Sequence, residues 1–138
     1  MLSDLFKKSN SQEDFLFDAS PEVVIYIDLR GRIAKINRRI YEWLGYKQAD
    51  LVGKSVFDLA FLTPESISLI KKNFTKRVRG EKIDPYDIKC FSKNGDIEAG
   101  RITAKLVKKA KIPVGVLVMI ANVTHLELEL KSHLNEIR

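Results

Sequence analysis

The sequence has few of the residues on which most catalytic and metal-binding sites depend. It contains one cysteine and two histidines. Cys90 has no partner for an internal disulfide, and no cluster of cysteines or carboxylates accompanies His125 and His133 in the sequence. No nucleophile elbow, phosphate-binding glycine loop or dinucleotide-binding motif occurs. We therefore predict no catalytic residue, no metal site and no enzyme activity in this chain.

Long apolar segments are also missing. No run approaches the ~20 residues that a membrane-spanning helix needs. The first residues, MLSDLFKKSNSQED, lack the apolar core of a signal peptide. Both absences favour a cytoplasmic chain with no direct membrane contact. With 138 residues, 45% of them hydrophobic and 30% charged, the chain is long enough for one globular domain with its own core.

Positive charge is in excess, with a formal net charge of +6, but it is dispersed. Basic residues occur in short groups at 38–39, 71–72, 76–79 and 105–111. No recognition-helix, zinc-finger or RNA-platform pattern accompanies them. We predict no nucleic-acid partner and interpret the charge as a solvated surface that suits an acidic partner. Nucleic-acid binding is a weaker alternative, and it would require a strongly salt-dependent affinity.

The first half of the chain contains a β-hairpin that leads into a helix. Val23–Ile27 is β-branched and aromatic, as strands are, and Asp28–Gly31 has the residues of a tight turn. Arg32–Asn37 is predicted to form the second strand. Hydrophobic residues then continue at helical spacing through 40–44. Two strands that lead directly into short helices predict a cup-shaped structure that can enclose a ligand.

The second half contains one long helix and three strands. Thr63-Pro64-Glu65 is a typical helix start, and Gly80 is placed to end the helix. Alternating or apolar runs predict strands at 86–90, 100–106 and 114–121, with a loop over Lys108–Pro113. Two strands, a helical layer and three more strands predict an α+β fold, with one antiparallel sheet and helices on one face.

An ordered set of short motifs runs through the chain. Its members are Asp28-x-x-Gly31-x-Ile33, Asn37, Leu44-Gly45-Tyr46, Leu51-x-Gly53-Lys54, Lys93-Asn94-Gly95 and the strand Gly115–Ile120. This set resembles the pattern of the PAS domain over about residues 15–124. The resemblance implies a five-stranded antiparallel sheet with short helices and one longer helix on one face. Residues 1–14 are then an N-terminal arm or amphipathic helix, and residues 125–138 a C-terminal signalling helix.

The resemblance also bears on cofactors. Haem-binding members of the family use a histidine on the long helix, and residues 65–79 contain none. Photoactive flavin members carry a reactive cysteine on the preceding short helix, and residues 56–62 contain none. Haem and covalently bound flavin are therefore not expected. A non-covalently bound flavin or a small apolar ligand remains open, since neither needs a bond from the protein.

A ligand would be held by residues that face the core beneath the long helix. The pocket candidates are Ile36, Ile40, Phe57, Ile67, Ile70, Phe74, Ile88, Cys90, Gly100, Ile102 and Met119. Gly100 has two interpretations. Its missing side chain leaves room for an apolar ligand, or it lies at a β-bulge and its neighbours fill the gap. We favour the filled core.

The end of the chain is predicted to relay the signal. Asn122, Val123 and Thr124 occupy the place of the family's D-I-T or D-V-T motif, with Asn in place of Asp, so no salt bridge from this position is expected. The candidates for a homodimer interface are Leu5, Phe6, Phe15, Leu126, Leu130 and Ile137.

The resemblance therefore implies a PAS sensory module, with a sensor histidine kinase as the expected parent and an effector domain (kinase or regulator) in that parent. The alternative is a ligand-free PAS module for dimerisation or protein interaction. Membership of a transcription regulator is a less favoured version of that alternative.

Overall fold

The computed structural model describes residues 11–137, with side chains from Phe15 to Glu136. Five strands form one antiparallel sheet in the order β2-β1-β5-β4-β3. In chain order the elements are α2 (Ser11–Ala19), β1 (Val23–Asp28), β2 (Ile33–Ile36), α3 (Arg39–Leu44), α4 (Gln48–Leu51), α5 (Pro64–Val78), β3 (Tyr86–Phe91), β4 (Ile97–Lys109), β5 (Ile112–Asn122) and α6 (Thr124–Ile137). The predicted α+β fold with a five-stranded antiparallel sheet is confirmed.

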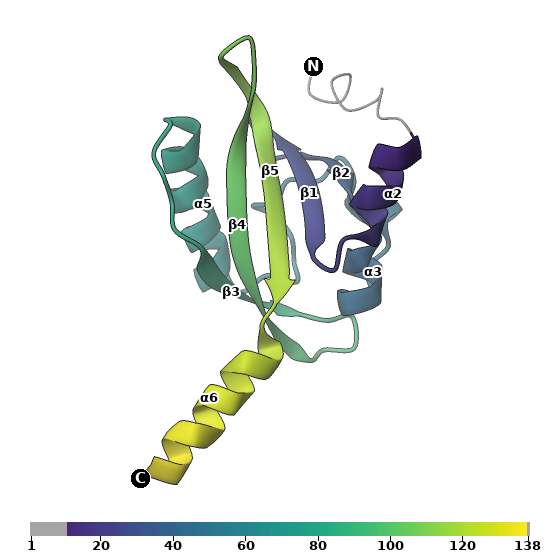
Figure 1. Cartoon of the computed structure of the whole chain (residues 1–138). Helices are drawn as coiled ribbons and strands as arrows, with labels where there is room; N and C mark the ends of the chain where they lie inside the picture. The colour runs from purple at the N-terminus through teal and green to yellow at the C-terminus, as the bar shows by residue number, and fades with distance from the viewer. Residues whose placement is uncertain (1–10, 138) are drawn as a thin grey trace.

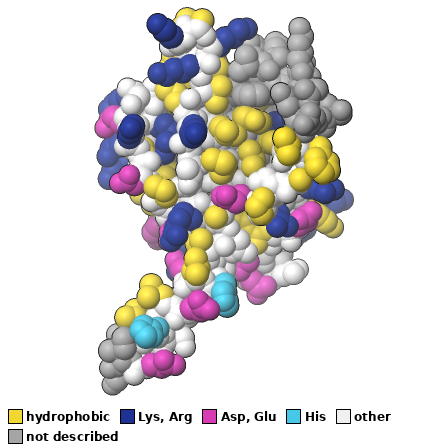
Figure 2. Space-filling model, viewed as in Figure 1, with side chains coloured by type: hydrophobic (Ala, Val, Ile, Leu, Met, Phe, Trp, Pro, Cys, Tyr) yellow, Lys and Arg dark blue, Asp and Glu magenta, His cyan; other side chains and the backbone are white. Residues whose placement is uncertain are grey.

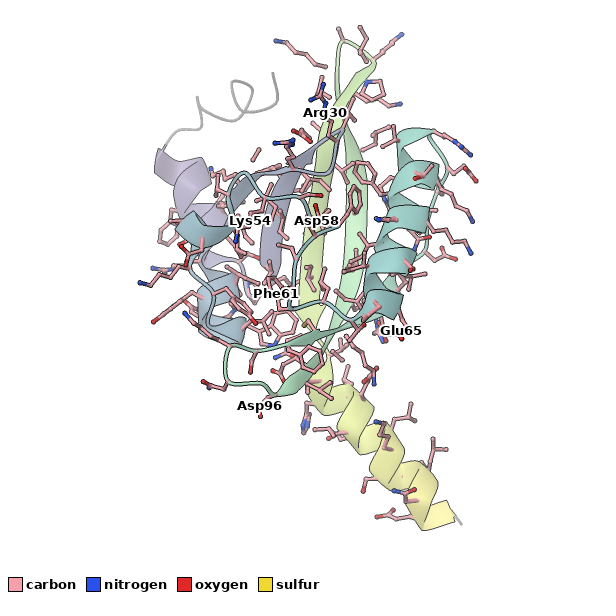
Figure 3. The ribbon with its side chains drawn as sticks, turned by 180° about the vertical axis from the view of Figure 1, so that it is seen from behind. Arg30, Lys54, Asp58, Phe61, Glu65 and Asp96 are labelled. Carbon is pink, nitrogen blue, oxygen red and sulfur yellow. The ribbon has the colours of Figure 1, made fainter. Side chains whose placement is uncertain are left out.

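One face of the sheet, here called the inner face, is covered by helices. Seen from behind, α3 and α4 lie on one side of this face and α5 on the other (Figure 3). The connecting segment that carries Lys54, Asp58 and Phe61 passes between them (Figure 3). The opposite, outer face is more open, and α6 extends away from the sheet (Figure 1). No helix within residues 11–137 is both long and apolar enough to cross a membrane.

The turn between β1 and β2 forms as its residues predict. The Asp28 carboxylate accepts hydrogen bonds from the backbone N–H groups of Arg30 and Arg32, each at 2.9 Å. Gly31 has a φ of +85°, which a residue with a side chain rarely adopts. A Cβ at Gly31 would also clash with the ring of Phe57. This turn therefore fixes β2 against the segment that follows α4.

Asn37 closes the hairpin on the side of α2. Its side chain is fully buried, and its Oδ1 accepts from the N–H of Val24 at 3.0 Å. Its Nδ2 donates to the carbonyls of Phe17 and Glu22 at 2.8 and 3.0 Å. Because each polar atom has a partner, the amide is buried without an unsatisfied group. Asn37 thus ties the N-terminal helix to the sheet.

The prediction of a loop over Lys108–Pro113 is wrong. β4 continues to Lys109 and β5 begins at Ile112, so the two strands form a long hairpin with a two-residue turn. Ala110 and Lys111 have φ values of 51° and 69°, which suits a turn with positive φ at both central positions. Pro113 pairs with Lys108 next to an irregularity in the register, and the ladder continues beyond it.

The long helix α5 starts and ends as predicted. The Thr63 hydroxyl accepts from the N–H of Ser66 at 3.2 Å, Pro64 is at the first position, and Gly80 has a φ of +91°. The inner side of the helix is partly polar, because the residues most buried along it are Ser66, Asn73 and Arg77.

Candidate functional site

An apolar cavity of about 80 Å³ lies between the inner face of the sheet and the helices that cover it. Both α3 and α5 contribute to its wall, as do all five strands and the segment between α4 and α5. Seven of the predicted pocket residues line it: Ile36, Ile40, Ile70, Phe74, Ile88, Cys90 and Ile102. The cavity is smaller than the ~150 Å³ apolar cavity that holds benzene. In this conformation it accepts only a small ligand.

Four predicted pocket residues do not line the cavity. Phe57 and Ile67 are half-buried and pack against the core, but their side chains lie outside the cavity wall. The prediction that Met119 lines the pocket is wrong, because successive side chains along a strand point to opposite faces of the sheet. Val118 and Ile120 of β5 face the cavity, so Met119 between them faces the outer side of the sheet.

Gly100 is the fourth predicted pocket residue that does not line the cavity. Neighbouring side chains fill the gap left by its missing side chain. A Cβ built on Gly100 would lie 2.7 Å from Cγ2 of Ile120 and 3.1 Å from Cη2 of Trp43. The residue pairs in regular register with Ile88 and Asn122, so no β-bulge occurs there. Gly100 therefore allows the Trp43 and Ile120 side chains to approach the strand, and the cavity lies elsewhere in the core.

Trp43 forms part of the cavity wall at the end of α3. Its indole N–H donates to Oε1 of Glu98 at 3.0 Å. Trp43 and Ile120 also line a second, more polar surface cleft, to which Arg39, Glu42 and Asn122 contribute. These two side chains therefore separate the core cavity from the surface. The helical spacing in 40–44 left two places open for Trp43, the core or a dimer surface, and it could not show this contact with both the cavity and the cleft.

Sequence reasoning missed the polar end of the cavity. Arg77 and Tyr86 both line it, and Arg77 has only 8% of its surface exposed. The Arg77 Nη1 donates to the carbonyl of Ala104 at 2.5 Å. Burial lowers the pKa of Arg77, and burial raises the pKa of Tyr86 against the opposing effect of a hydrogen bond with Asn73. A signal did exist, since positions 66, 70, 73 and 77 share one side of a helix.

Cys90 lies in the wall as a buried thiol. It is 2% exposed, and its Sγ is 3.7 Å from the carbonyl oxygen of Glu98. Burial first, and the nearby charge of Glu98 second, raise the pKa of the Cys90 thiol to about 12. Because the thiolate is the reactive form, a thiol of this kind is inert near neutral pH. Its part in the cavity is that of a small apolar side chain.

The junction between β5 and α6 is tied to β4 at Ala99. The N–H of Val123 donates to the Ala99 carbonyl at 2.9 Å, and the N–H of Ala99 donates to the Thr124 hydroxyl at 2.9 Å. Asn122 Oδ1 accepts from the N–H of Thr124 at 3.1 Å. Lys89 Nζ on β3 lies 3.6 Å from Oε2 of Glu127, one turn into α6. The three predicted relay residues therefore lie together where the helix starts.

Comparison with known proteins decides the family. The family model for the PAS domain matches residues 21–125. The chain belongs to the PAS domain family. The match begins just before β1 and ends at the start of α6, so it includes the sheet, the cavity and the junction. A search of curated proteins finds no match.

Several solved PAS domains share the fold. One from Colwellia psychrerythraea has a TM-score of 0.71 and 20% identity, over 83% of this chain and 96% of that one. The PAS domain of the Cronobacter turicensis RpfR quorum-sensing receptor, solved in complex with BDSF, has a TM-score of 0.64 and 22% identity, over 76% and 96%. A PAS domain from a two-component sensor histidine kinase has a TM-score of 0.64 and 11% identity, over 80% and 93%.

The PAS domain here lacks the residues that fix haem or covalent flavin in the family. The helix α5 contains no histidine, and the segment before it contains no cysteine. Among the described residues, no group of three or more His, Cys, Asp or Glu side chains is arranged to hold a metal ion. A flavin needs far more space than about 80 Å³, so the observed conformation would have to open to admit one.

The predicted dimer residues lie partly at the surface and partly outside the described side chains. Phe15 is 69% exposed on α2, and Leu126 and Leu130 are 54% and 60% exposed on α6. Leu5 and Phe6 lie outside the described residues, and the side chain of Ile137 is also outside them. The division placed between residues 14 and 15 falls within α2, and α6 begins at Thr124.

Proposed function

We propose that this PAS domain is a sensory module that binds a small apolar ligand in its core cavity. Binding changes the contacts at the junction between Ala99 and the start of α6, and α6 passes this change to an effector domain in the parent protein. The parent protein in this proposal is a sensor histidine kinase. One observation carries this proposal. Strand β5 forms part of the cavity wall and leads, after Val123 alone, into α6.

The path from cavity to helix is short and has few contacts to change. Val116, Val118 and Ile120 of β5 face the cavity, and Asn122 is the last residue of the same strand. Beyond it, α6 extends away from the sheet, and its contacts with the rest of the domain are concentrated in its first turn (Figure 1). A small displacement of β5 therefore changes the direction in which the whole of α6 extends.

Two structural neighbours support the proposal. The RpfR PAS domain has also been solved in complex with C12:0, again at a TM-score of 0.64 and 22% identity, so a PAS domain of this fold binds a small molecule in that protein. The histidine-kinase PAS domain shows the same fold in a kinase of the two-component class. A signal requires that the ligand bind two conformations with different affinity. The small size of the cavity suits this requirement, because a ligand must expand it.

Native mass spectrometry tests whether the cavity binds a ligand. The purified protein is measured as isolated and after addition of hexan-1-ol, a small apolar probe. We expect either a co-purified small molecule or uptake of hexan-1-ol. The variant Ala104→Leu places extra volume in the cavity wall and should abolish uptake. The control Thr103→Leu adds the same side chain on the exposed face of β4 and should leave the uptake of hexan-1-ol unchanged. Absence of any bound molecule in the wild type would contradict the proposal.

A ligand-free module for dimerisation is the second candidate, and the outer surface favours it. Hydrophobic side chains are visible over the outer face of the sheet and beside α2 (Figure 2). Phe17 holds α2 on this face by stacking on Tyr26, with the two ring centroids 5.6 Å apart, while Phe15 and Leu16 are exposed. The same mass spectra separate the two candidates. Dimers that carry no small molecule and take up no hexan-1-ol would favour the interaction module.

A further inference from the structure

The cavity is apolar except at one end, where α5 faces β3 and β4. Arg77 and Tyr86 line the cavity there, and Asn73 lies one helical turn before Arg77 on the same side of α5. Asn73 and Arg77 are each 8% exposed, so these polar groups lie within the protein and not on its surface. A buried polar cluster at the end of an apolar cavity is suited to orienting a ligand with one polar end.

Arg77 is a buried cation without an anionic partner among the described residues. The ion pairs of residues 15–136 involve Arg38, Arg39, Lys89, Arg101 and His125, and none includes Arg77. Buried charges are normally paired, because removing an ion from water costs several kcal/mol. A guanidinium carries five N–H donors. The hydrogen bond to the Ala104 carbonyl uses only one of them.

Part of the role of Arg77 is structural. Strand β3 begins at Tyr86, which pairs with Ile102 of β4, so β4 continues beyond the start of its neighbour. The Ala104 carbonyl lies in this uncovered part of β4, and Arg77 supplies its hydrogen-bond donor. A neutral donor such as glutamine could do the same. The positive charge, which is costly to bury, is not explained by this contact.

We propose that Arg77, assisted by the Tyr86 hydroxyl, binds the carboxylate of a small monocarboxylic acid whose apolar tail occupies the core cavity. The carboxylate supplies the missing anion and accepts hydrogen bonds from the unused guanidinium donors, which favours a paired geometry. A cavity of about 80 Å³ holds only part of a six-carbon tail, so binding of hexanoate requires the cavity to expand, as the proposed function states. The inference rests on the proposed function and adds the chemical class of the ligand.

The test compares two ligands that differ only at their polar end. Hexanoate and hexan-1-ol are titrated into the full chain at pH 7, and binding is followed by calorimetry and by the fluorescence of Trp43. Trp43 is the only tryptophan in the chain and lies in the cavity wall. The variants are Arg77→Met, which removes the charge, and Arg77→Lys, which keeps it. Arg79→Met is the matched control, because it removes an exposed charge from the same end of α5.

We expect the wild type to bind hexanoate roughly 10- to 100-fold more tightly than hexan-1-ol, since a charge-assisted hydrogen bond is worth about that factor. Arg77→Met should remove this preference while hexan-1-ol still binds, and Arg77→Lys should keep part of it. Arg79→Met should leave the preference intact. If Arg77→Met fails to fold, the wild type and Arg77→Lys still decide the question.

Three results would overturn the inference. Equal binding of acid and alcohol by the wild type would show that the cavity does not select a carboxylate. An equal loss of preference in Arg77→Met and Arg79→Met would assign the effect to net charge and not to the buried guanidinium. Failure of both ligands to bind would overturn the proposed function, and this inference with it. The first two results would overturn the inference alone.

Discussion

The Thr124 hydroxyl contacts both backbone groups of Ala99: it accepts from the N–H at 2.9 Å and lies 3.4 Å from the carbonyl oxygen. The same carbonyl accepts from the N–H of Val123. One residue of β4 therefore holds the start of α6 through backbone and side chain together. A displacement of β5 relative to β4 would change the hydrogen bonds of this joint between Ala99 and the start of α6 first, since Val123 directly follows β5.

Replacing Thr124 by valine should loosen this joint. The valine has nearly the same shape, but the Ala99 N–H loses its acceptor inside the protein. We expect a loss of about 1–3 kcal/mol in the free energy of unfolding, measured by urea titration. The amide of Ala99 should also exchange faster with solvent. Thr103→Val on the exposed face of β4 is the control. If both variants lose the same stability, the joint has no special role.

Asn122 offers a second test of the same region. Its side chain accepts from the N–H of Thr124 at the start of α6, which an aspartate would also do. An added negative charge at a helix N-terminus is favourable by about 0.3–1 kcal/mol. Asn122→Asp should therefore raise the free energy of unfolding slightly, and Asn122→Ala should lower it by about 0.5–2 kcal/mol. The junction model also expects Asn122→Asp to alter the output of a full-length parent. An Asn122→Ala variant as stable as wild type would contradict this account of the helix start.

The sequence predicted the parts of the fold that depend on local chemistry. Asp28 and Gly31 identify the first turn because a carboxylate and a positive φ are needed at fixed places in it. Thr63 identifies the start of α5 because a hydroxyl is needed to cap it. In each case the cause lies within a few residues of its effect, so spacing alone is enough.

The sequence could not predict features that depend on distant segments. Residues 76–79 contain three basic residues at a helix end, which is typical of a solvated surface, yet Arg77 is buried because β3 is shorter than β4. The run 114–121 is apolar throughout, so alternation could not show that Met119 faces outward. The register of β5 with β1 and β4 decides that. The packing of Trp43 on Gly100 likewise joins residues far apart in the chain.

Gly100→Ala should disturb the cavity wall at a known place. The added methyl group would meet Cγ2 of Ile120 at 2.7 Å and the Trp43 ring at 3.1 Å, so both must move. We expect a loss of about 1–3 kcal/mol in the free energy of unfolding and a shift in Trp43 fluorescence. The double variant Gly100→Ala with Ile120→Ala should lose less than the sum of the two single changes. Strict additivity would show that Ile120 is not the obstacle.

Cys90 should react slowly in the folded protein. Its pKa is raised to about 12, so at pH 8 the thiolate fraction is about a thousandfold lower than that of a thiol with a pKa near 9. Because the folded-state pKa is the higher one, the contribution of this thiol to stability is complete below about pH 9 and is lost as the pH rises toward 12. Labelling with a disulfide reagent at pH 8 should be at least about 100-fold slower than in urea. Equal rates would mean that the thiol is exposed. Cys90 is the only cysteine, so the signal is unambiguous.

Hydrogen exchange at the Ala99 amide, with the cavity empty and with hexan-1-ol bound, tests the central claim most directly. This amide donates to Thr124 and therefore reports the state of the joint. Occupancy is monitored in the same samples by Trp43 fluorescence. We predict that ligand binding changes the exchange rate at Ala99 and in the first turn of α6, and leaves the amides of Ala110 and Lys111 at the distant hairpin turn unchanged. Saturation of the cavity with no change at Ala99 would contradict the account.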